Sequence, residues 1–420
     1  MKFKNLSRLA ALACSATILF GCEEAESPTS APVERPAFKQ ISLSTRQGEH
    51  IKLSNEMAFN LFKSINANPM HRYAKNKVIS PLSIYMLLSM LANGDDGVVA
   101  QEIINVLAGG GENSIEDLNN LNSYLLTELP KVDQTTKLAI SNSLWLNQKY
   151  SCNASFKALL TDCYDGDFQE VDFGNKSTLK NLINDWVKDK TAGMIKNFAN
   201  EDNLINQTAF VVNASYFKGT WKDPFPAEQS KNAVFHSSTG DQKITMMHTQ
   251  TNFLYYADET VQAIELPYGS SNYSMWVLLP CADTGTDRLI SELDPATMQN
   301  INQSMRDYEV ELALPRWSAQ SRLELNVADF KNLGILNLFT SGLPGICNEH
   351  ILNVDYLLTQ TCINVDETGT EAAAASMNSD YTAPDPFIKT AKMTVDHPFI
   401  FIIKEASTNA IMFMGVVNQI

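Results

Sequence analysis

The sequence predicts an α+β fold, in which helices dominate the first half of the chain and the strands of large sheets dominate the second half. Two observations support this prediction. In the first half, apolar residues recur at positions i, i+3, i+4 and i+7, as in amphipathic helices, whereas the second half contains nearly continuous apolar runs bounded by turn residues. No stretch between residues 45 and 420 has the composition of a linker, and so this whole region is expected to form one domain.

Three stretches of the first half predict helices. The second of them has Ser80 in the position of an N-cap, followed by Pro81, which suits the first turn of a helix, and it ends at Asn93-Gly94. The third is expected to end at Gly193. The stretches are SNEMAFNLFKSIN, SPLSIYMLLSMLANG and LINDWVKDKTAGMI.

Two stretches of the second half each predict a pair of strands joined by a turn. In the first stretch, a Gly-Ser-Ser-Asn turn separates two apolar runs. The second stretch is apolar almost throughout, which is typical of strands that are buried on both faces of a sheet. The stretches are VQAIELPYGSSNYSMWVLLP and PFIFIIKEASTNAIMFMGVV.

The N-terminus predicts export from the cell. Residues 1–21 have a basic start and a short apolar run, which is typical of a signal peptide rather than of a membrane span. The run ends in Leu-Phe-Gly-Cys, which resembles the lipobox of bacterial lipoproteins, and this resemblance implies that a lipid is attached to Cys22. A plain secretory signal peptide with an incidental cysteine is the alternative. Residues 22–44 are rich in proline and poor in apolar residues, and so they are expected to be a disordered tether.

The expected cellular location and the net charge limit the kinds of partner that the protein is expected to bind. Glu24 stands where an aspartate would imply retention at the inner membrane, and so the protein is expected at the outer membrane, on its periplasmic or cell-surface face, or outside the cell. The chain carries a formal net charge of −15, and removal of the three cations in residues 1–21 leaves −18. A chain this acidic is not expected to bind nucleic acid or an anionic membrane surface. The lipid alone would hold it at a membrane.

The sequence contains none of the common active-site motifs: neither a GxSxG elbow, nor HExxH, nor a phosphate-binding loop, nor GxGxxG after a strand. The six histidines are dispersed, and no cluster of histidines and cysteines predicts a metal site. We therefore expect a protein that is not an enzyme and that needs no cofactor or metal. Cys152 and Cys163 are near enough in the sequence to form a disulfide, although buried thiols explain them equally well.

Seven motifs follow one another along the chain: ISPLSIYMLLSMLANG, ISNSLWLNQ, INDWVKDKTAGMI, VVNASYFKGTW, AIELPYG, VELALPRW and DHPFIFIIKEASTNAIMFMGVV. In these motifs and in their order, the sequence from about residue 48 to its end resembles the serpins, a family of serine protease inhibitors. The resemblance implies the serpin fold, with several helices around three β-sheets and an exposed reactive-centre loop near the C-terminus. It also implies that Ser80, Ser83 and Asn213 belong to the shutter beneath the main sheet and that Trp221 lies at the breach, where the sheet opens. Thr359 stands where many serpins have a shutter histidine.

The stretch VDETGTEAAAAS resembles the hinge of the serpin reactive-centre loop, which would lie within about residues 367–390. In inhibitory serpins a protease cleaves this loop and forms an acyl-enzyme, after which the cut loop inserts into the main sheet and traps the protease as a covalent complex. Small side chains suit such an insertion, and strand alternation from Thr370 would turn small residues toward the core at every second position. The hinge residues are Glu367, Gly369, Thr370, Glu371, Ala372, Ala373, Ala374 and Ala375.

Several alternatives concern this loop. Without the flanking motifs, the alanine-rich stretch has the propensity of a short exposed helix. Asn378 and Asp380 continue the inward-facing set and are costly to bury, which favours a non-inhibitory binding or chaperone-like member as the alternative function. The resemblance otherwise implies a monomer that inhibits an elastase-like or chymotrypsin-like serine protease, with a cysteine protease as a further alternative. Family spacing places the reactive bond after Ala383 when it is counted from Gly369 and after Phe387 when it is counted back from Pro398. Because most serine proteases do not cleave before a proline and Pro384 follows Ala383, bonds after Tyr381 and Thr382 are further candidates.

Overall fold

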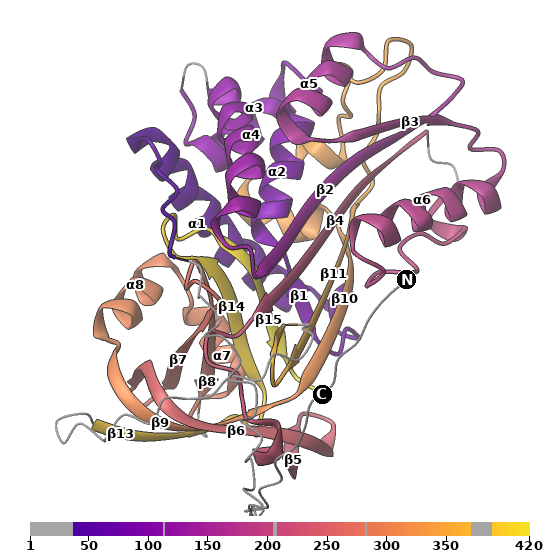
Figure 1. Cartoon of the computed structure of the whole chain (residues 1–420). Helices are drawn as coiled ribbons and strands as arrows, with labels where there is room; N and C mark the ends of the chain where they lie inside the picture. The colour runs from indigo at the N-terminus through magenta and orange to yellow at the C-terminus, as the bar shows by residue number, and fades with distance from the viewer. Residues whose placement is uncertain (1–36, 112–113, 205–207, 282–283, 371–388) are drawn as a thin grey trace, which may run out of the picture. The chain divides into compact units, whose positions relative to one another are not determined.

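The computed structural model describes residues 37–111, 114–204, 208–281, 284–370 and 389–420. Helices are concentrated in the first half of this part of the chain and strands in the second half (Figure 1). The α-helices are α1 (Thr45–Ala67), α2 (Pro81–Ala92), α3 (Val98–Ala108), α4 (Ser114–Val132), α5 (Ala154–Tyr164), α6 (Lys176–Lys190), α7 (Gly285–Glu292), α8 (Pro295–Ser304) and α9 (Val327–Phe330). The prediction of an α+β fold is confirmed.

The strands fall into two hydrogen-bonded sheets within the described residues. The first has the order β1-β15-β14-β8-β7-β6-β9-β13, with β5 also paired to β6, and the second has the order β10-β11-β12-β4-β2-β3. The strands are β1 (Lys77–Ile79), β2 (Thr136–Asn147), β3 (Asp167–Val171), β4 (Ala209–Thr220), β5 (Lys231–Ser237), β6 (Gly240–Ala257), β7 (Val261–Tyr268), β8 (Tyr273–Pro280), β9 (Arg306–Pro315), β10 (Trp317–Leu325), β11 (Leu357–Asp366), β12 (Gly369–Thr370), β13 (Lys389–Thr394), β14 (Phe399–Glu405) and β15 (Ile411–Val417).

The number of sheets differs from the three that the family resemblance implies. The reason is β6, whose 18 residues pair with β5 over residues 240–246, with β9 over residues 246–255 and with β7 over residues 254–257. Because one long strand takes part in all of these ladders, two sheets are joined into a single nine-stranded sheet. The two predicted strand pairs are confirmed as β7 with β8 and β14 with β15, which pair in antiparallel fashion.

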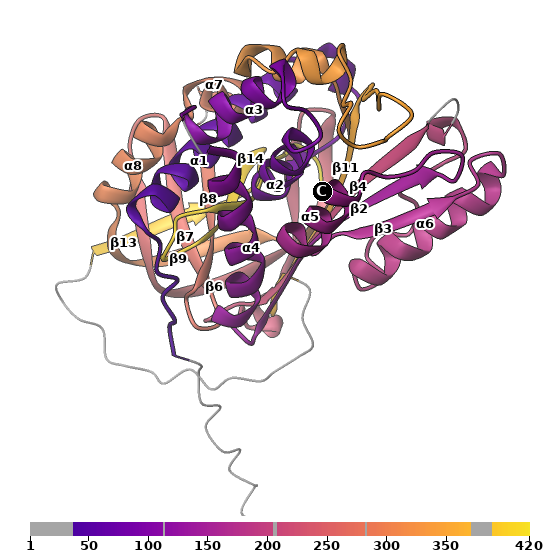
Figure 2. The same cartoon turned by 90° about the horizontal axis from the view of Figure 1, so that it is seen from above.

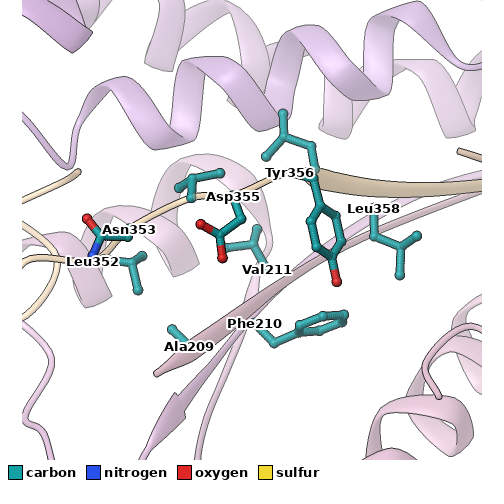
Figure 3. A pocket seen from close by; sticks show the side chains of 10 residues that line it. Ala209, Phe210, Val211, Leu352, Asn353, Asp355, Tyr356 and Leu358 are labelled. Atoms are coloured by element: carbon teal, nitrogen blue, oxygen red, sulfur yellow. The ribbon is translucent and has the colours of Figure 1, made fainter. Parts of the chain in front are cut away.

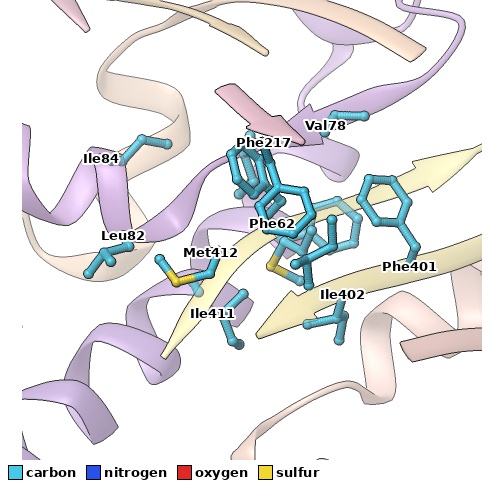
Figure 4. Packing of buried hydrophobic residues seen from close by; sticks show 14 of the residues in the cluster. Phe62, Val78, Leu82, Ile84, Phe217, Phe401, Ile402, Ile411 and Met412 are labelled. Carbon is cyan, nitrogen blue, oxygen red and sulfur yellow. The ribbon is translucent and has the colours of Figure 1, made fainter. Parts of the chain in front are cut away.

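The core of the domain lies between the two sheets and around α2. Every residue of α2 is buried, which agrees with a helix that is apolar on all sides. Phe217 of β4 packs against Phe413 of β15 and Tyr273 of β8, with ring centroids 5.9 and 5.7 Å apart. Figure 4 shows Phe217 and Phe62 in the same buried cluster as side chains of β14 and β15. Burial of each such large apolar side chain contributes about 1.5–3 kcal/mol to folding.

The helix ends differ in detail from the predictions. Ser80 precedes α2, but its hydroxyl makes no capping hydrogen bond and instead donates to the carbonyl of Met412, 2.8 Å away. The extended backbone before Pro81 therefore sets the start of α2, without a side-chain cap. The third predicted helix, α6, ends at Lys190 rather than at Gly193, because Thr191 and Ala192 already leave the helical conformation.

The six-stranded sheet is covered on both faces. On one face, α6 packs its apolar side chains against a cluster that includes Val212 and Ala214 of β4 and Leu358 of β11. On the other face, the strands lie over α2, as Figure 1 and Figure 2 show. Strand alternation explains this arrangement, because Asn213 between Val212 and Ala214 points to the opposite side, toward α2.

The N-terminal boundary of the folded part lies before residue 45. Ile41 is buried, its backbone N–H donates to the Ser407 hydroxyl, and the backbone N–H of Lys39 donates to Asn272. The segment predicted to be a tether therefore contacts the domain from about residue 39 onward, and its apolar side chain at position 41 is buried. None of the helices in the described ranges is both long and apolar enough to cross a membrane.

Candidate functional site

The six-stranded sheet contains a two-residue strand, β12, at a place where its two neighbours could pair with each other. β12 is antiparallel to both: Thr370 lies opposite Gly219 of β4 and opposite Val365 of β11. A few residues further along, β4 and β11 are direct parallel partners, from Asn213 opposite Thr359 to Tyr216 opposite Cys362. The chain after β11 thus turns back and enters the sheet between two strands that close up again beyond it.

Gly369 permits this close approach. Its φ angle is +153°, a conformation that favours glycine. A Cβ atom at this position would lie 2.7 Å from the Cα atom of Thr220 and would also collide with the Gly219 carbonyl oxygen. Since both obstacles are backbone atoms of β4, any side chain at residue 369 would push β12 out of the sheet.

Thr370 is anchored on the core side of the sheet. It is fully buried, and its hydroxyl lies 2.7 Å from the hydroxyl of Tyr268. The Tyr268 ring stacks on Trp221, with ring centroids 4.4 Å apart and planes inclined by 11°. Burial raises the pKa of Tyr268 far above its usual range, and the hydrogen bond with Thr370 offsets only part of that effect, so the hydroxyl stays neutral.

Trp221 holds the turn between β11 and β12. Its indole N–H donates to the carbonyl of Asp366 at 3.0 Å, and its backbone N–H donates to the carbonyl of Thr368 at 2.9 Å. The backbone N–H of Phe225 donates to the carbonyl of Glu367 at 2.8 Å. The structure therefore brings Trp221 together with the predicted hinge residues Glu367, Gly369 and Thr370.

A charged clamp fixes the same turn from the other side. The Arg316 guanidinium binds the Glu367 carboxylate with two hydrogen bonds, Nη2 to Oε1 at 2.6 Å and Nε to Oε2 at 3.1 Å, and the Ser230 hydroxyl donates to Oε1 at 2.5 Å. Burial alone would raise the pKa of Glu367, but the hydrogen bonds from Arg316 and Ser230 outweigh it and lower the pKa. The hydrogen bond to Glu367 likewise raises the pKa of Arg316. Both groups are charged at neutral pH.

The predicted shutter residues do not all share one hydrogen-bond network. The Ser83 hydroxyl donates to Oδ1 of Asn213 at 2.6 Å, and Nδ2 of Asn213 donates to Oδ1 of Asn142 at 2.8 Å. Ser80 bonds the carbonyl of Met412 instead and takes no part in this network. Thr359, for which the resemblance implies a histidine in many serpins, is buried in β11 opposite Asn213.

At the far end of the same strand pair, β4 and the segment before β11 enclose a cavity of about 30 Å³. Its walls are Ala209, Phe210 and Val211 on one side and residues 352–358 on the other. Figure 3 shows the Asp355 carboxylate pointing into this space, with Phe210 and Val211 facing it from β4. The two strands are therefore separated at both ends and joined only in the middle.

The remaining predicted site residues lie outside the described residues. Within the described part, the chain leaves the six-stranded sheet at Thr370 and next pairs in β13, where Lys389 lies opposite Tyr308 of β9 in the nine-stranded sheet. Residues 371–388 thus connect one sheet to the other. The residues outside the described ranges are Cys22, Glu371, Ala372, Ala373, Ala374, Ala375, Tyr381, Thr382, Ala383 and Phe387.

Sequence reasoning missed four side chains of the site. Tyr268 and Arg316 occur in AIELPYG and VELALPRW, and Asn142 occurs in ISNSLWLNQ, but none of these motifs indicates what its side chains contact. The one available signal was a polar residue inside an otherwise apolar strand, as at Asn142. No local pattern singles out Ser230, because only the fold brings it to Glu367.

Comparisons with known proteins agree with this geometry. A family model described as Serpin (serine protease inhibitor) matches residues 52–420. An uncharacterized serpin-like protein of Thermococcus kodakarensis is 31% identical, over 86% of this chain and 83% of that protein. The human leukocyte elastase inhibitor is 29% identical, over 86% of this chain and 97% of that protein.

Solved structures give the same result. The thermophilic serpin tengpin in its native state superimposes on this chain with a TM-score of 0.79 and 26% sequence identity. The match covers 92% of this chain and 98% of the tengpin chain. The match of the family model to most of the chain, together with a relative above 30% identity, establishes the family. The chain belongs to the serpin family.

Proposed function

We propose that this serpin inhibits proteases as a suicide substrate, by inserting its cleaved loop between β4 and β11. The family and the fold support a protease-inhibitor role in general. The insertion mechanism rests on one observation, which is that β12 already occupies a strand position between these two neighbours.

The register of β12 supports this proposal. Thr370 lies opposite Gly219 and Val365, and an extension of β12 in the same register would bring Ser376 opposite both Asn213 and Thr359. Asn213 and Thr359 are already direct partners. A growing strand would therefore separate existing pairs one after another without any slip of β4 along β11.

The small side chains of the hinge suit the space they would enter. In the extended register, Ala372 would lie between Phe217 and Ile363, both of which are fully buried. Ala374 would lie between Ser215 and Thr361, which are also buried. A large or charged side chain at either position would have to displace close-packed core residues.

The energetics favour insertion once the middle of the sheet has opened. Four residue pairs join β4 directly to β11, and at about 1 kcal/mol per hydrogen bond their separation costs on the order of 4 kcal/mol. A strand that lies along all ten residues of β11 would recover on the order of 10 kcal/mol in ladder hydrogen bonds. The uncut state is therefore held by a barrier rather than by equilibrium.

We further propose an elastase-like or chymotrypsin-like serine protease as the target. The candidate reactive bonds follow Tyr381, Thr382, Ala383 or Phe387, and no Lys or Arg lies between Gly369 and Ile388. A trypsin-like enzyme would therefore find no preferred residue in this part of the loop. A cysteine protease remains the alternative target class.

The experiment mixes the full chain with elastase, chymotrypsin and papain and analyses the products by denaturing gel electrophoresis and mass spectrometry. A conjugate that survives boiling supports suicide inhibition, and the mass of the C-terminal fragment identifies the cleaved bond. Cleavage of the loop without any conjugate across this panel would refute the proposal and would favour the non-inhibitory, binding alternative.

A variant pair separates insertion from cleavage. Ala372→Glu places a carboxylate between Phe217 and Ile363, and we expect cleavage to continue while the conjugate is lost. Ala372→Ser at the same position stays small, and we expect it to retain the conjugate. Equal conjugate yields from the two variants would contradict insertion along this register.

We also propose that the protein is exported as a monomer and anchored through a lipid on Cys22. The support is the sequence pattern of residues 1–22, which resembles a lipoprotein signal. Labelling with radioactive palmitate in a bacterial host should be lost in Cys22→Ala and retained in Cys14→Ala. Retention of label in Cys22→Ala would refute the anchor.

A further inference from the structure

Two cysteines that are far apart in the sequence lie opposite each other in the structure. Cys152, in the connection between β2 and α5, forms an isolated antiparallel bridge with Cys347, in the segment that leads toward β11. The backbone N–H of Asn153 donates to the carbonyl of Ile346 at 2.9 Å, and the backbone N–H of Asn348 donates to the carbonyl of Ser151 at 3.1 Å. These two hydrogen bonds flank the cysteine pair on either side.

This hydrogen-bond pattern defines the geometry of the pair. The cysteines do not bond each other's backbone, so they form a non-hydrogen-bonded pair, in which opposite Cα atoms are about 4.5 Å apart and the side chains share one face. Disulfides span Cα distances of about 4.4–6.8 Å. The backbone therefore already holds Cys152 and Cys347 at a separation that a disulfide requires.

Neighbouring contacts fix the two segments against each other. The Tyr150 and His350 rings stack with centroids 4.9 Å apart and planes inclined by 21°. The Glu349 carboxylate accepts hydrogen bonds from the backbone N–H and the hydroxyl of Ser151, at 2.9 and 2.5 Å. Contacts on both sides of the cysteine pair thus limit the freedom of its backbone.

The pairing of Cys152 with Cys163, which the sequence left open, does not fit the fold. Cys163 lies near the end of α5, whose first residue is Ala154. At 1.5 Å per residue, the helix separates Ala154 from Cys163 by roughly 14 Å, far beyond the reach of a disulfide. Within the described residues, Cys347 is the cysteine that faces Cys152.

We propose that Cys152 and Cys347 are the site of a structural disulfide that forms when the protein meets an oxidising thiol–disulfide environment. Both residues are thiols in the structure, Cys347 is buried and Cys152 is partly exposed. Burial, and next the neighbouring Cys347, raise the pKa of Cys152 to about 11, and burial also raises the pKa of Cys347. The thiols are therefore protonated at neutral pH and exchange slowly.

The chemistry requires one two-electron oxidant of the disulfide class, for example glutathione disulfide. The more exposed Cys152 thiolate attacks the glutathione disulfide and expels one glutathione thiolate. The Cys347 thiolate then attacks the sulfur of Cys152 in the mixed disulfide and expels the second. Two protein thiols lose two protons and two electrons, and one glutathione disulfide becomes two glutathione thiols.

The bridge would join the two sides of the six-stranded sheet. Cys152 follows β2, which pairs with β4, whereas Cys347 lies in the segment that becomes β11. β4 and β11 are the two strands between which β12 lies. A covalent link at this point would hold the strands together beside the cavity lined by residues 352–358.

The experiment equilibrates the full chain in a glutathione buffer with excess glutathione disulfide, alkylates the remaining thiols and maps the disulfides by mass spectrometry. We expect a peptide pair linked through Cys152 and Cys347 and the loss of two alkylatable thiols relative to the reduced chain. The matched variant Cys163→Ser should keep the link, whereas Cys347→Ser should lose it.

Two results would overturn the proposal. One is a link from Cys152 to Cys163 in the wild-type chain. The other is complete alkylation of both Cys152 and Cys347 after equilibrium has been reached from the oxidised and the reduced side. Both measurements use the wild-type chain, so they do not depend on the folding of any variant.

Discussion

The position of Thr370 between β4 and β11, in hydrogen-bond contact with Tyr268, can be tested with a double-mutant cycle. The Thr370 and Tyr268 hydroxyls are 2.7 Å apart and both residues are fully buried. Tyr268→Phe removes one hydroxyl and leaves the other buried without its partner, which costs about 1–3 kcal/mol. Thr370→Val keeps the shape of the side chain and leaves Tyr268 unpaired at a similar cost. The double variant leaves no polar group unpaired, and so its loss should be well below the sum of the single losses.

The assay is urea unfolding of the four full-length proteins, followed by tryptophan fluorescence. We expect a coupling energy of about 1 kcal/mol or more between the two changes. Tyr256→Phe is a matched control, because its hydroxyl donates to Asp258 at an exposed position, and it should shift the unfolding free energy by less than about 0.5 kcal/mol. Additive losses in the cycle would show that Thr370 does not contact Tyr268, and the argument for a partly inserted hinge would then fail.

Three further predictions concern the same sheet. Gly369→Ala should displace β12, at a cost of about 1–3 kcal/mol, and hydrogen exchange should speed up at residues 365–370 but not in β13. The pKa of Glu367 is lowered in the folded state, and so its ion pair with Arg316 stabilises the protein at pH values above the unfolded pKa of about 4.3. This stabilisation is lost as the pH falls through the folded pKa. In urea titrations, wild type should therefore be more stable than Glu367→Gln at pH 7, and the difference should vanish at acid pH. An extended β12 would place Asp380 opposite Ala209 and Asp355, so Asp380→Asn should stabilise the cleaved chain by about 0.2–1 kcal/mol and leave the intact chain unchanged in thermal unfolding.

Much of the fold could be predicted because it follows from local patterns. The continuous apolar runs around Trp276 and Phe401 define buried hairpins, and Pro81 defines the start of α2. The joining of two sheets into one could not be predicted from local patterns, because it depends on the pairing of β6 with β9, about 60 residues further along the chain. Sequence periodicity shows that a strand exists but not which strands lie beside it.

The same distinction between local pattern and distant pairing applies to the candidate site. Gly369 and Thr370, which form β12, could be singled out in the sequence because glycine and small residues suit a close approach of two backbones. Glu367 was singled out by the family resemblance alone. The partners Arg316 and Tyr268 could not be singled out, because each reaches the hinge only through the pairing of strands that are 51 or more residues distant in the chain. Ser80 shows the opposite error, since an N-cap pattern was present but the hydroxyl found a better acceptor in Met412 of β15.

Chain length implies that the full insertion proposed above would require cleavage of the loop. The intact chain is anchored in one sheet at Thr370 and in the other at Lys389, with 18 residues between them. If n residues after Thr370 join the sheet, the growing strand extends about 3.3n Å away from the breach, and the remaining 19 − n residue steps must span at least that distance on the way back. The two lengths become equal at about nine residues, close to residue 379. Asp380, which an extended β12 would bring opposite Ala209 at the start of β4, would therefore be out of reach until a protease cut the loop or β13 left its sheet.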